Sequence, residues 1–263
     1  MESYRVRANN TATASTNKIH DDTVARQYGF SGGLVPGVDV FAYLIHPVVE
    51  HFGAEWLGDG TIRARFHQPV YDGRWVTVTV EPEPAGDGIA VIARDEAGAD
   101  CALAIARAGV KAPAPAVEDF PIAALPDPRP PASADALQQA EPLGSIESAF
   151  DAAKAAVYLE QIGETLPLYR NERIAHPGWL LRRANRILAA NVALGPWIHV
   201  ESEVELYDLV HDGDDVSTRG HVRNVWEAKG HKFVTLDVLV AAGGTRSVLR
   251  AEHTAIYEPR PRS

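Results

Sequence analysis

His20 combines a side chain able to carry a proton with a neighbouring loop rich in glycine. It follows Asn17 by three residues in the stretch "STNKIHDD", and the segment "YGFSGGLVPG" leads from there to a predicted helix. Imidazole exchanges a proton near neutral pH, so His20 is a candidate acid or base. An amide does not titrate, and Asn17 is expected to hold the loop through bonds from its short side chain to neighbouring backbone.

Three carboxylates stand close to this stretch. Asp21 and Asp22 precede the short segment "TVARQYG", and Asp39 lies two residues into the helix predicted after Pro36. Asp is among the preferred residues at helix starts, where it caps free N–H groups and matches the helix dipole. Capping is therefore the favoured interpretation of all three, while Asp22 and Asp39 are kept as alternative catalytic carboxylates.

Composition excludes several classes of function. The chain has 263 residues, of which 46% are hydrophobic and 23% charged, and its formal net charge of −10 argues against nucleic acid as a partner. No apolar run of about eighteen residues, signal peptide or lipidation motif is present, so a cytoplasmic protein without membrane contact is expected. Cys101 is the single cysteine and the histidines show no ligand spacing, so no metal is expected.

The chain has the pattern of two copies of one unit. A first unit is predicted at 1–110, a proline-rich linker at 111–140, and a second unit at 141–263. Each unit contains one long helix pattern followed by several strand patterns. The dipeptide Pro-Gly opens both helices, at Pro36 and at Pro177, and "VYDGRWVTV" and "VHDGDDVST" follow at similar distances.

This order of elements predicts an α+β fold. Strands that wrap around a long helix bury its apolar stripe, and two such units pair to cover the remaining edge and face. Within the first helix, Pro47 is expected to kink or end the regular part.

The arrangement is similar to a double hot-dog fold, two helix-wrapped antiparallel sheets in one chain. Residues 15–37 resemble the overhanging segment of MaoC-like (R)-specific enoyl-CoA hydratases and dehydratases. The residues that carry this resemblance are Asn17, Ile19, His20, Ala25, Gly29, Phe30, Leu34, Val35, Pro36 and Gly37.

The resemblance implies a lyase that adds water to, or removes it from, the α,β-positions of an acyl thioester of coenzyme A or a carrier protein. His20 would move the proton, and Asn17 would fix the loop. The thioester carbonyl gains negative charge during the reaction, and the backbone amide of Gly37 or Val38 would stabilise it with help from the helix dipole. No cofactor is implied beyond the coenzyme A moiety of the substrate.

One position departs from the family pattern. The family has an aspartate two residues before Asn17, and Ser15 stands there. A serine hydroxyl does not act as a carboxylate base at neutral pH. The second unit departs further, because aligning Gly163 with Gly29 places Lys154 opposite His20. A single site in the first unit is therefore expected, with the second unit shaping the acyl tunnel.

Two other functions stay open on these residues. Hot-dog folds also include thioesterases, for which Asp39 is the best-placed carboxylate, and the serine at the aspartate position suits a catalytically impaired acyl-CoA-binding protein. The arginines of "LLRRANRIL", Arg182, Arg183 and Arg186, are expected on a solvated helix face. The expected protein partner is a second copy of the same double unit.

Overall fold

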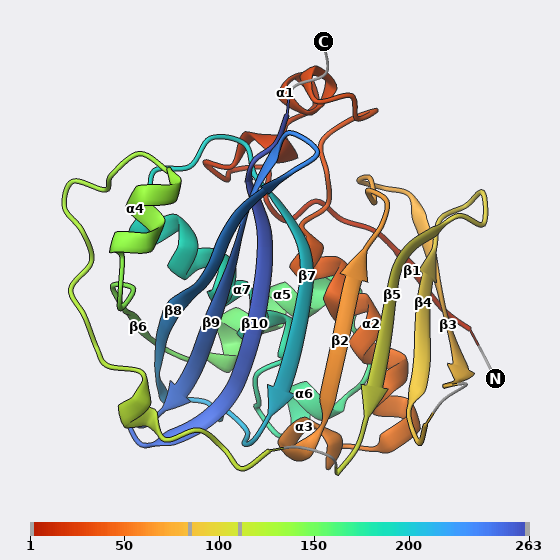
Figure 1. The fold of residues 1–263 in the computed structure, drawn as a ribbon. Coiled ribbons are helices and arrows are strands. Elements are labelled where there is room, and N and C mark those ends of the chain that lie inside the picture. Colours follow the sequence, from red (N-terminus) through yellow and green to blue (C-terminus); the bar gives the residue numbers. More distant parts are fainter. Residues whose placement is uncertain (1–2, 84–85, 110–111, 261–263) are drawn as a thin grey trace.

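A continuous antiparallel sheet covers one side of the molecule, with the long helices behind it (Figure 1). The computed structural model describes residues 3–83, 86–109 and 112–260. The strands are β1 (Tyr4–Arg7), β2 (Thr61–Phe66), β3 (Trp75–Pro82), β4 (Ile89–Arg94), β5 (Asp100–Arg107), β6 (Ile146–Ala149), β7 (Ile198–Leu206), β8 (Asp215–Ala228), β9 (His231–Ala242) and β10 (Arg246–Glu258). Their order in the sheet is β1-β3-β4-β5-β2-β7-β10-β9-β8-β6, so each half of the chain supplies one half of the sheet.

The helices divide between the same two halves. The α-helices are α1 (Asp22–Gln27), α2 (Gly37–Phe52), α3 (Trp56–Asp59), α4 (Ala134–Gln139), α5 (Ala152–Gln161), α6 (Leu168–Asn171) and α7 (Pro177–Asn191), with 3-10 turns η1 (Lys18–His20) and η2 (Val117–Asp119). Helix α2 packs on strands of the first half and α7 on strands of the second, and the two helices contact each other. The predicted helix-then-strands order is confirmed in both halves.

Helix α2 is buried over nearly its whole length. Phe41, Leu44 and Ile45 are fully buried, and a helix that is apolar on most sides belongs in a core. Pro47 does not end it, because the helix continues to Phe52. Proline removes one amide donor, and the packing around α2 keeps the helix continuous in spite of that loss.

The two halves meet at the pairing of β2 with β7. Ile62 lies opposite Val204 in this pair, and both side chains are buried against the helices. On the outer face, Glu201 pairs with Arg63 at 2.6 Å and with Arg65 at 2.9 Å. The join is therefore apolar toward the core and ionic toward solvent, the alternation expected of a half-buried antiparallel pair.

Equivalent backbone hydrogen bonds show which residues of the halves correspond. Val35 N donates to Val70 O at 2.8 Å, and Ala175 N donates to Val210 O at 2.9 Å. Each bond ties the residue before the N-cap of a central helix to the turn before a long strand. Val35 therefore corresponds to Ala175.

This correspondence corrects the Pro-Gly landmarks by one residue. Pro36 corresponds to His176, and Gly37 corresponds to Pro177. Pro36 is the N-cap of α2, whereas Pro177 is the first residue of α7. Both positions suit proline because its fixed φ fits a helix start and its missing N–H is not needed there.

The proline-rich segment lies on the outer face of the second half rather than projecting into solvent. Val117 and Phe120 pack with Leu239 and Ala241 of β9, and Arg219 donates to the carbonyls of Val117 and Phe120 at 3.2 and 3.1 Å. The segment also contains η2 and α4. The predicted boundary between residues 110 and 111 falls outside the described residues.

Candidate functional site

His20 ends the turn η1, which short side chains hold in place. The Asn17 side chain caps η1 by accepting from Ile19 N, and Asp21 caps α1 by accepting from Thr23 N and Val24 N. Ser15 Oγ accepts from Asn17 N at 3.1 Å. Ser15 therefore shapes the loop at the position where the family pattern has a carboxylate.

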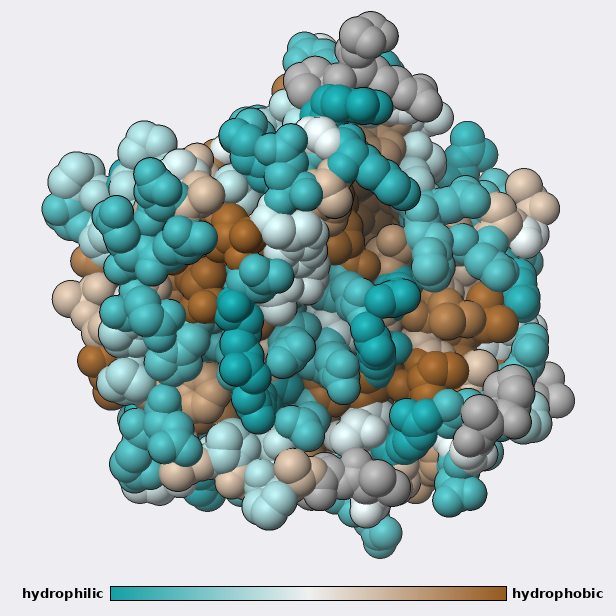
Figure 2. Space-filling model, in the orientation of Figure 1, coloured by the Kyte–Doolittle hydropathy of each residue, from teal (hydrophilic) through white to brown (hydrophobic). Residues whose placement is uncertain are grey.

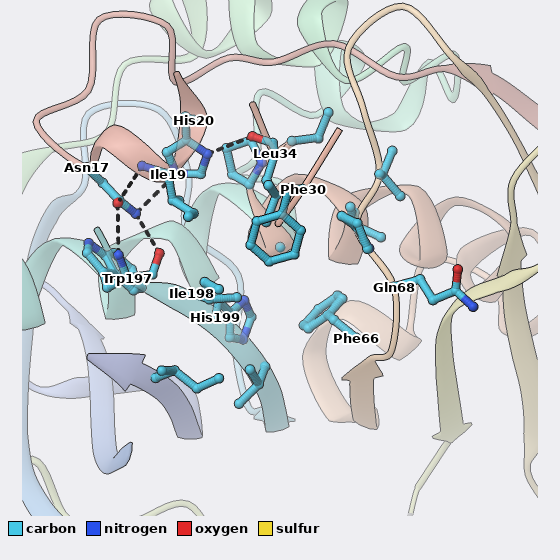
Figure 3. Close-up of a pocket in the computed structure, with 18 of the residues that line it drawn as sticks. Asn17, Ile19, His20, Phe30, Leu34, Phe66, Gln68, Trp197, Ile198 and His199 are labelled. Carbon is cyan, nitrogen blue, oxygen red and sulfur yellow. Dashed lines mark hydrogen bonds between the residues drawn. The ribbon is translucent and has the colours of Figure 1, made fainter. Parts of the chain in front are cut away.

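The hydrogen bonds of the His20 ring fix its tautomer. Nδ1 lies 2.7 Å from the carbonyl oxygen of Leu34, which can only accept, so Nδ1 carries the proton (Figure 3). Nε2 is then the unprotonated nitrogen, with the Asn17 amide nitrogen 3.3 Å away as a donor. Burial lowers the pKa of His20, and the charge of Arg182 lowers it further. His20 is therefore a neutral base at neutral pH.

Asn17 also ties the loop to the other half of the chain. Its amide nitrogen donates to Trp197 O at 2.9 Å, and Trp197 N donates to its amide oxygen at 3.1 Å (Figure 3). Trp197 immediately precedes β7. The paired bonds bring the first-half loop onto the start of a second-half strand, so the site is composite.

The start of α2 presents free amides. Its N-cap residue, Pro36, makes no side-chain capping bond, and the backbone N–H groups of Gly37 and Val38 have no hydrogen-bond partner among the described residues. Free first-turn amides together with the helix dipole form a site for a negative charge. The two amides that the sequence singled out are thus available to an oxyanion.

The corresponding helix start in the second half is closed. Gly178 N donates to His176 Nδ1 at 2.9 Å, and the preceding residue, Pro177, has no N–H. His176 and His46 both lie against the buried carboxylate of Glu164, at 3.3 and 2.7 Å. Hydrogen bonds and charge from the two histidines hold the Glu164 pKa far below its usual value against the opposing effect of burial. Side chains therefore occupy the place where a second site would lie.

Two adjoining pockets meet at His20. The first, about 350 Å³, is mainly apolar; it is lined in part by Phe30, Phe66, Ile198 and Ile256. Figure 2 shows an apolar hollow below α1, above the ends of the central strands. The second pocket, about 470 Å³, lies along α7. The residues that line both pockets are Asn17, His20, Pro36, Asn185 and Trp197.

The structure places the alternative carboxylates away from these pockets. Asp22 accepts from Gly33 N at 2.7 Å and so holds the glycine-rich loop. Asp39 is fully buried, accepts from the Thr11 hydroxyl and lies 3.8 Å from the Arg182 guanidinium. Burial raises the pKa of Asp39, while Arg182 and Thr11 oppose that effect. Neither carboxylate lines either pocket.

Sequence reasoning missed three residues, all from the second half. Trp197 and Asn185 line both pockets, and the amide oxygen of Asn185 is buried without a hydrogen-bond partner among the described residues. His199 lies against Gly37 and bonds through Nε2 to Ser202 Oγ at 2.8 Å. Trp197 and His199 stand two residues apart at the start of a predicted strand, so their side chains point to the same face. That spacing was the available signal in the sequence.

No group of three or more metal-ligating side chains occurs in the part of the chain that the structure describes. No described helix is long and apolar enough to cross a membrane.

No protein-family model matches the sequence, and no curated protein is significantly similar to it. Solved structures do match its fold. A Chloroflexus aurantiacus protein assigned as a MaoC-domain dehydratase is 13% identical, with 98% of this chain and 95% of that chain covered and a TM-score of 0.61. A conserved Mycobacterium tuberculosis protein with a double hot-dog fold is 18% identical, with 97% and 95% covered and a TM-score of 0.59. A Thermobifida fusca protein assigned as a thioesterase II is 14% identical, with 97% and 92% covered and a TM-score of 0.51.

These similarities establish the fold. The chain is a double hot-dog of the α+β class, as the sequence predicted. Its structural neighbours include proteins assigned as dehydratases and as thioesterases, so this fold does not by itself define the reaction.

Proposed function

We propose that the chain adds water to, or removes it from, the α,β-positions of an acyl thioester carried by coenzyme A or an acyl carrier protein. One observation carries the proposal. A neutral imidazole with an unprotonated Nε2, that of His20, stands in the wall shared by two pockets, next to the uncapped start of α2. That start offers the amides of Gly37 and Val38 to the thioester oxygen.

In the hydration direction, His20 serves as the only base. The long contact of 3.3 Å from the Asn17 amide leaves Nε2 as substrate binds. Nε2 then takes a proton from water while the water oxygen bonds to the β-carbon, and the π electrons move to the thioester oxygen. The amides of Gly37 and Val38 stabilise that oxyanion. The imidazolium then returns the proton to the α-carbon, and His20 is again neutral. Dehydration follows the same steps in reverse.

Asn185 supplies part of what the absent aspartate would have done. Asn185 lines the same shared wall as His20, and its amide oxygen is buried without a hydrogen-bond partner among the described residues; rotation of the side chain toward the pocket lets that oxygen accept a hydrogen bond from the reacting water. An amide orients water without taking its proton, so the proton transfer falls to His20 alone. The arrangement therefore needs one titrating group.

The thioesterase alternative has less support from this geometry. Its candidate carboxylate, Asp39, is sealed from both pockets by Thr11 and Arg182, and attack on a thioester requires contact with the carbonyl carbon. A non-catalytic binder would use the same pockets without turnover. One assay separates the three functions.

Purified protein is incubated with crotonyl-CoA and longer enoyl-CoAs while loss of the enoyl absorbance and release of free thiol are followed. We expect loss of absorbance without thiol, and a fall of about 100-fold or more in His20→Ala, the lower range for loss of a general base. His51→Ala, an exposed histidine in the last turn of α2 that lines neither pocket, is the control. Thiol release that Asp39→Asn abolishes would establish the thioesterase, and binding without turnover would establish the binder.

A further inference from the structure

The second pocket has an unusual charge for this chain. Its charged lining residues are Arg182, Arg183 and Arg186, and no carboxylate of the described residues lines it, although the chain as a whole carries a formal net charge of −10. A concave, partly desolvated surface of one sign attracts small ions of the opposite sign. The polar lining residues Thr11, Ser15, Thr16 and Asn185 add hydrogen-bonding groups.

Two of the three arginines have no counter-charge among the described residues. Arg183 is 1% exposed, and its guanidinium donates to neutral oxygens, those of Thr218, Ser148 and Val216 at 2.6, 2.8 and 2.9 Å. The expected position of Arg183 on a solvated face is therefore wrong. Its burial and the nearby Arg186 lower the pKa of Arg183 to about 10, and it stays cationic at neutral pH.

Arg186 is exposed at the pocket and forms no ion pair with any described residue. It lies one turn beyond Arg182, which Asp39 and Thr11 hold in place at 3.8 and 3.0 Å. Residues four apart on a helix share one face, so Arg182 and Arg186 point to the same side of α7. The guanidinium N–H groups of Arg186 are therefore free to donate to a ligand.

These arginines lie beside the reacting centre. Arg182 donates to Thr11, and the preceding residue, Asn10, donates to the backbone oxygen of His20 at 2.9 Å. Arg186 and His20 line the same pocket of about 470 Å³. The nearest phosphate of a coenzyme A or carrier arm is about thirteen bonds from the thioester sulfur, roughly 15 Å at the extended spacing of ~1.2 Å per bond. An anion that meets these arginines belongs on the acyl side of the thioester.

We propose that the arginine-lined pocket binds a carboxylate carried by the acyl group, close to its double bond, so that the substrates are monothioesters of unsaturated dicarboxylic acids. The inference rests on the proposed function and specifies its substrate class. Arg186 binds the carboxylate, and the thioester carbonyl lies at the start of α2. The apolar pocket binds the uncharged pantetheine arm, between the thioester sulfur and the first phosphate.

Saturated thioesters test the pocket without any turnover. Succinyl-CoA and butyryl-CoA differ only in a terminal carboxylate or methyl group, and neither can be hydrated. Calorimetric titration is expected to show succinyl-CoA binding roughly tenfold to hundredfold more tightly, the range for a charge-assisted hydrogen bond. Arg186→Gln should remove this preference and leave butyryl-CoA affinity within about twofold. Arg74→Gln, an exposed arginine before β3, is the matched control.

The corresponding unsaturated pair consists of fumaryl-CoA, which is the monothioester of fumarate, and crotonyl-CoA. The wild-type kcat/KM should favour the fumaryl thioester, and Arg186→Gln should reduce that ratio by at least tenfold. Equal affinity for succinyl-CoA and butyryl-CoA would overturn the inference. So would an equal loss for both ligands in Arg186→Gln, because that result assigns the arginine to a phosphate of the arm. A succinyl preference without hydration of either unsaturated thioester would retain the pocket and refute the proposed function.

Discussion

Asn17 and Trp197, 180 residues apart, hydrogen-bond to each other twice, in the manner of paired backbone strands. The contact is buried and holds the histidine loop on the second half of the molecule. Since Asn17 also donates toward His20, one side chain couples the fold of the site to the position of its base.

Replacement of Asn17 tests this coupling. Asn17→Ala leaves the N–H and the carbonyl of Trp197 buried without partners, and each such group costs about 1–3 kcal/mol. We expect a loss of stability of about 2 kcal/mol or more in urea unfolding, together with a large loss of hydratase activity. Lys18→Ala, on the exposed side of the same turn, should change neither quantity appreciably. An Asn17→Ala protein with normal stability would contradict the coupling.

Much of this loop could be predicted from sequence because its bonds are local. The turn at His20, the cap at Asp21 and the helix start at Gly37 all depend on residues within a few positions of one another. Asn185 and Trp197 could not be found in the same way, because Asn185 reaches the site through the packing of α7 on α2 and Trp197 through the pairing of β2 with β7.

The burial of Arg183 also depends on contacts between segments far apart in the sequence. Helical periodicity places Arg183 on a polar face, yet it is buried because β6 and β8 fold over that face and supply neutral acceptors. The Pro-Gly landmarks were displaced by one residue because proline suits both an N-cap and a first helical position. Spacing alone does not distinguish those positions.

Asn185 gives a second prediction. Its amide oxygen accepts from the reacting water in the proposed reaction, so Asn185→Leu, which keeps the side-chain size, should lower kcat by about tenfold or more with little change in stability. Asn185→Asp restores an acceptor and should retain more activity than Asn185→Leu. Steady-state kinetics with crotonyl-CoA measure both variants. Equal rates in wild type and Asn185→Leu would remove Asn185 from the reaction.

The close approach of Gly37 to His199 gives a third prediction. A β-carbon at Gly37 would lie 2.8 Å from His199 Nδ1, and the imidazole is anchored by Ser202. Gly37→Ala should therefore displace the start of α2 and reduce kcat at least tenfold. Combining it with His199→Ala should restore part of the loss, since contacting residues couple in a double-mutant cycle. Strict additivity of the two changes would show that the contact is unimportant.

The protonation of His20 gives a fourth prediction. The reaction needs the neutral imidazole, and burial and Arg182 lower the pKa of His20 below its ordinary value of 6.5. Activity should therefore fall toward acid pH as Nε2 is protonated, with the midpoint of that fall below pH 6.5. Arg182→Gln should move the acid limb of the kcat/KM profile toward higher pH. A limb that stays in place would show that Arg182 has no influence on His20.

Two stacked histidines behind the site should make the protein sensitive to acid. His199 and His253 lie with ring centroids 4.2 Å apart, and burial lowers the pKa of His199 well below its usual value and that of His253 to about 3. The unfolded chain binds their protons near pH 6.5 and the folded chain does not, so stability falls as pH drops below about 6.5. Each histidine contributes a slope of about 1.4 kcal/mol per pH unit. Urea unfolding between about pH 6.5 and 5 should show that the free energy of unfolding changes less steeply with pH in His253→Gln than in the wild type. His51→Gln, a change of an exposed histidine, is the control. An unchanged slope in His253→Gln would mean that His253 is protonated in the folded protein.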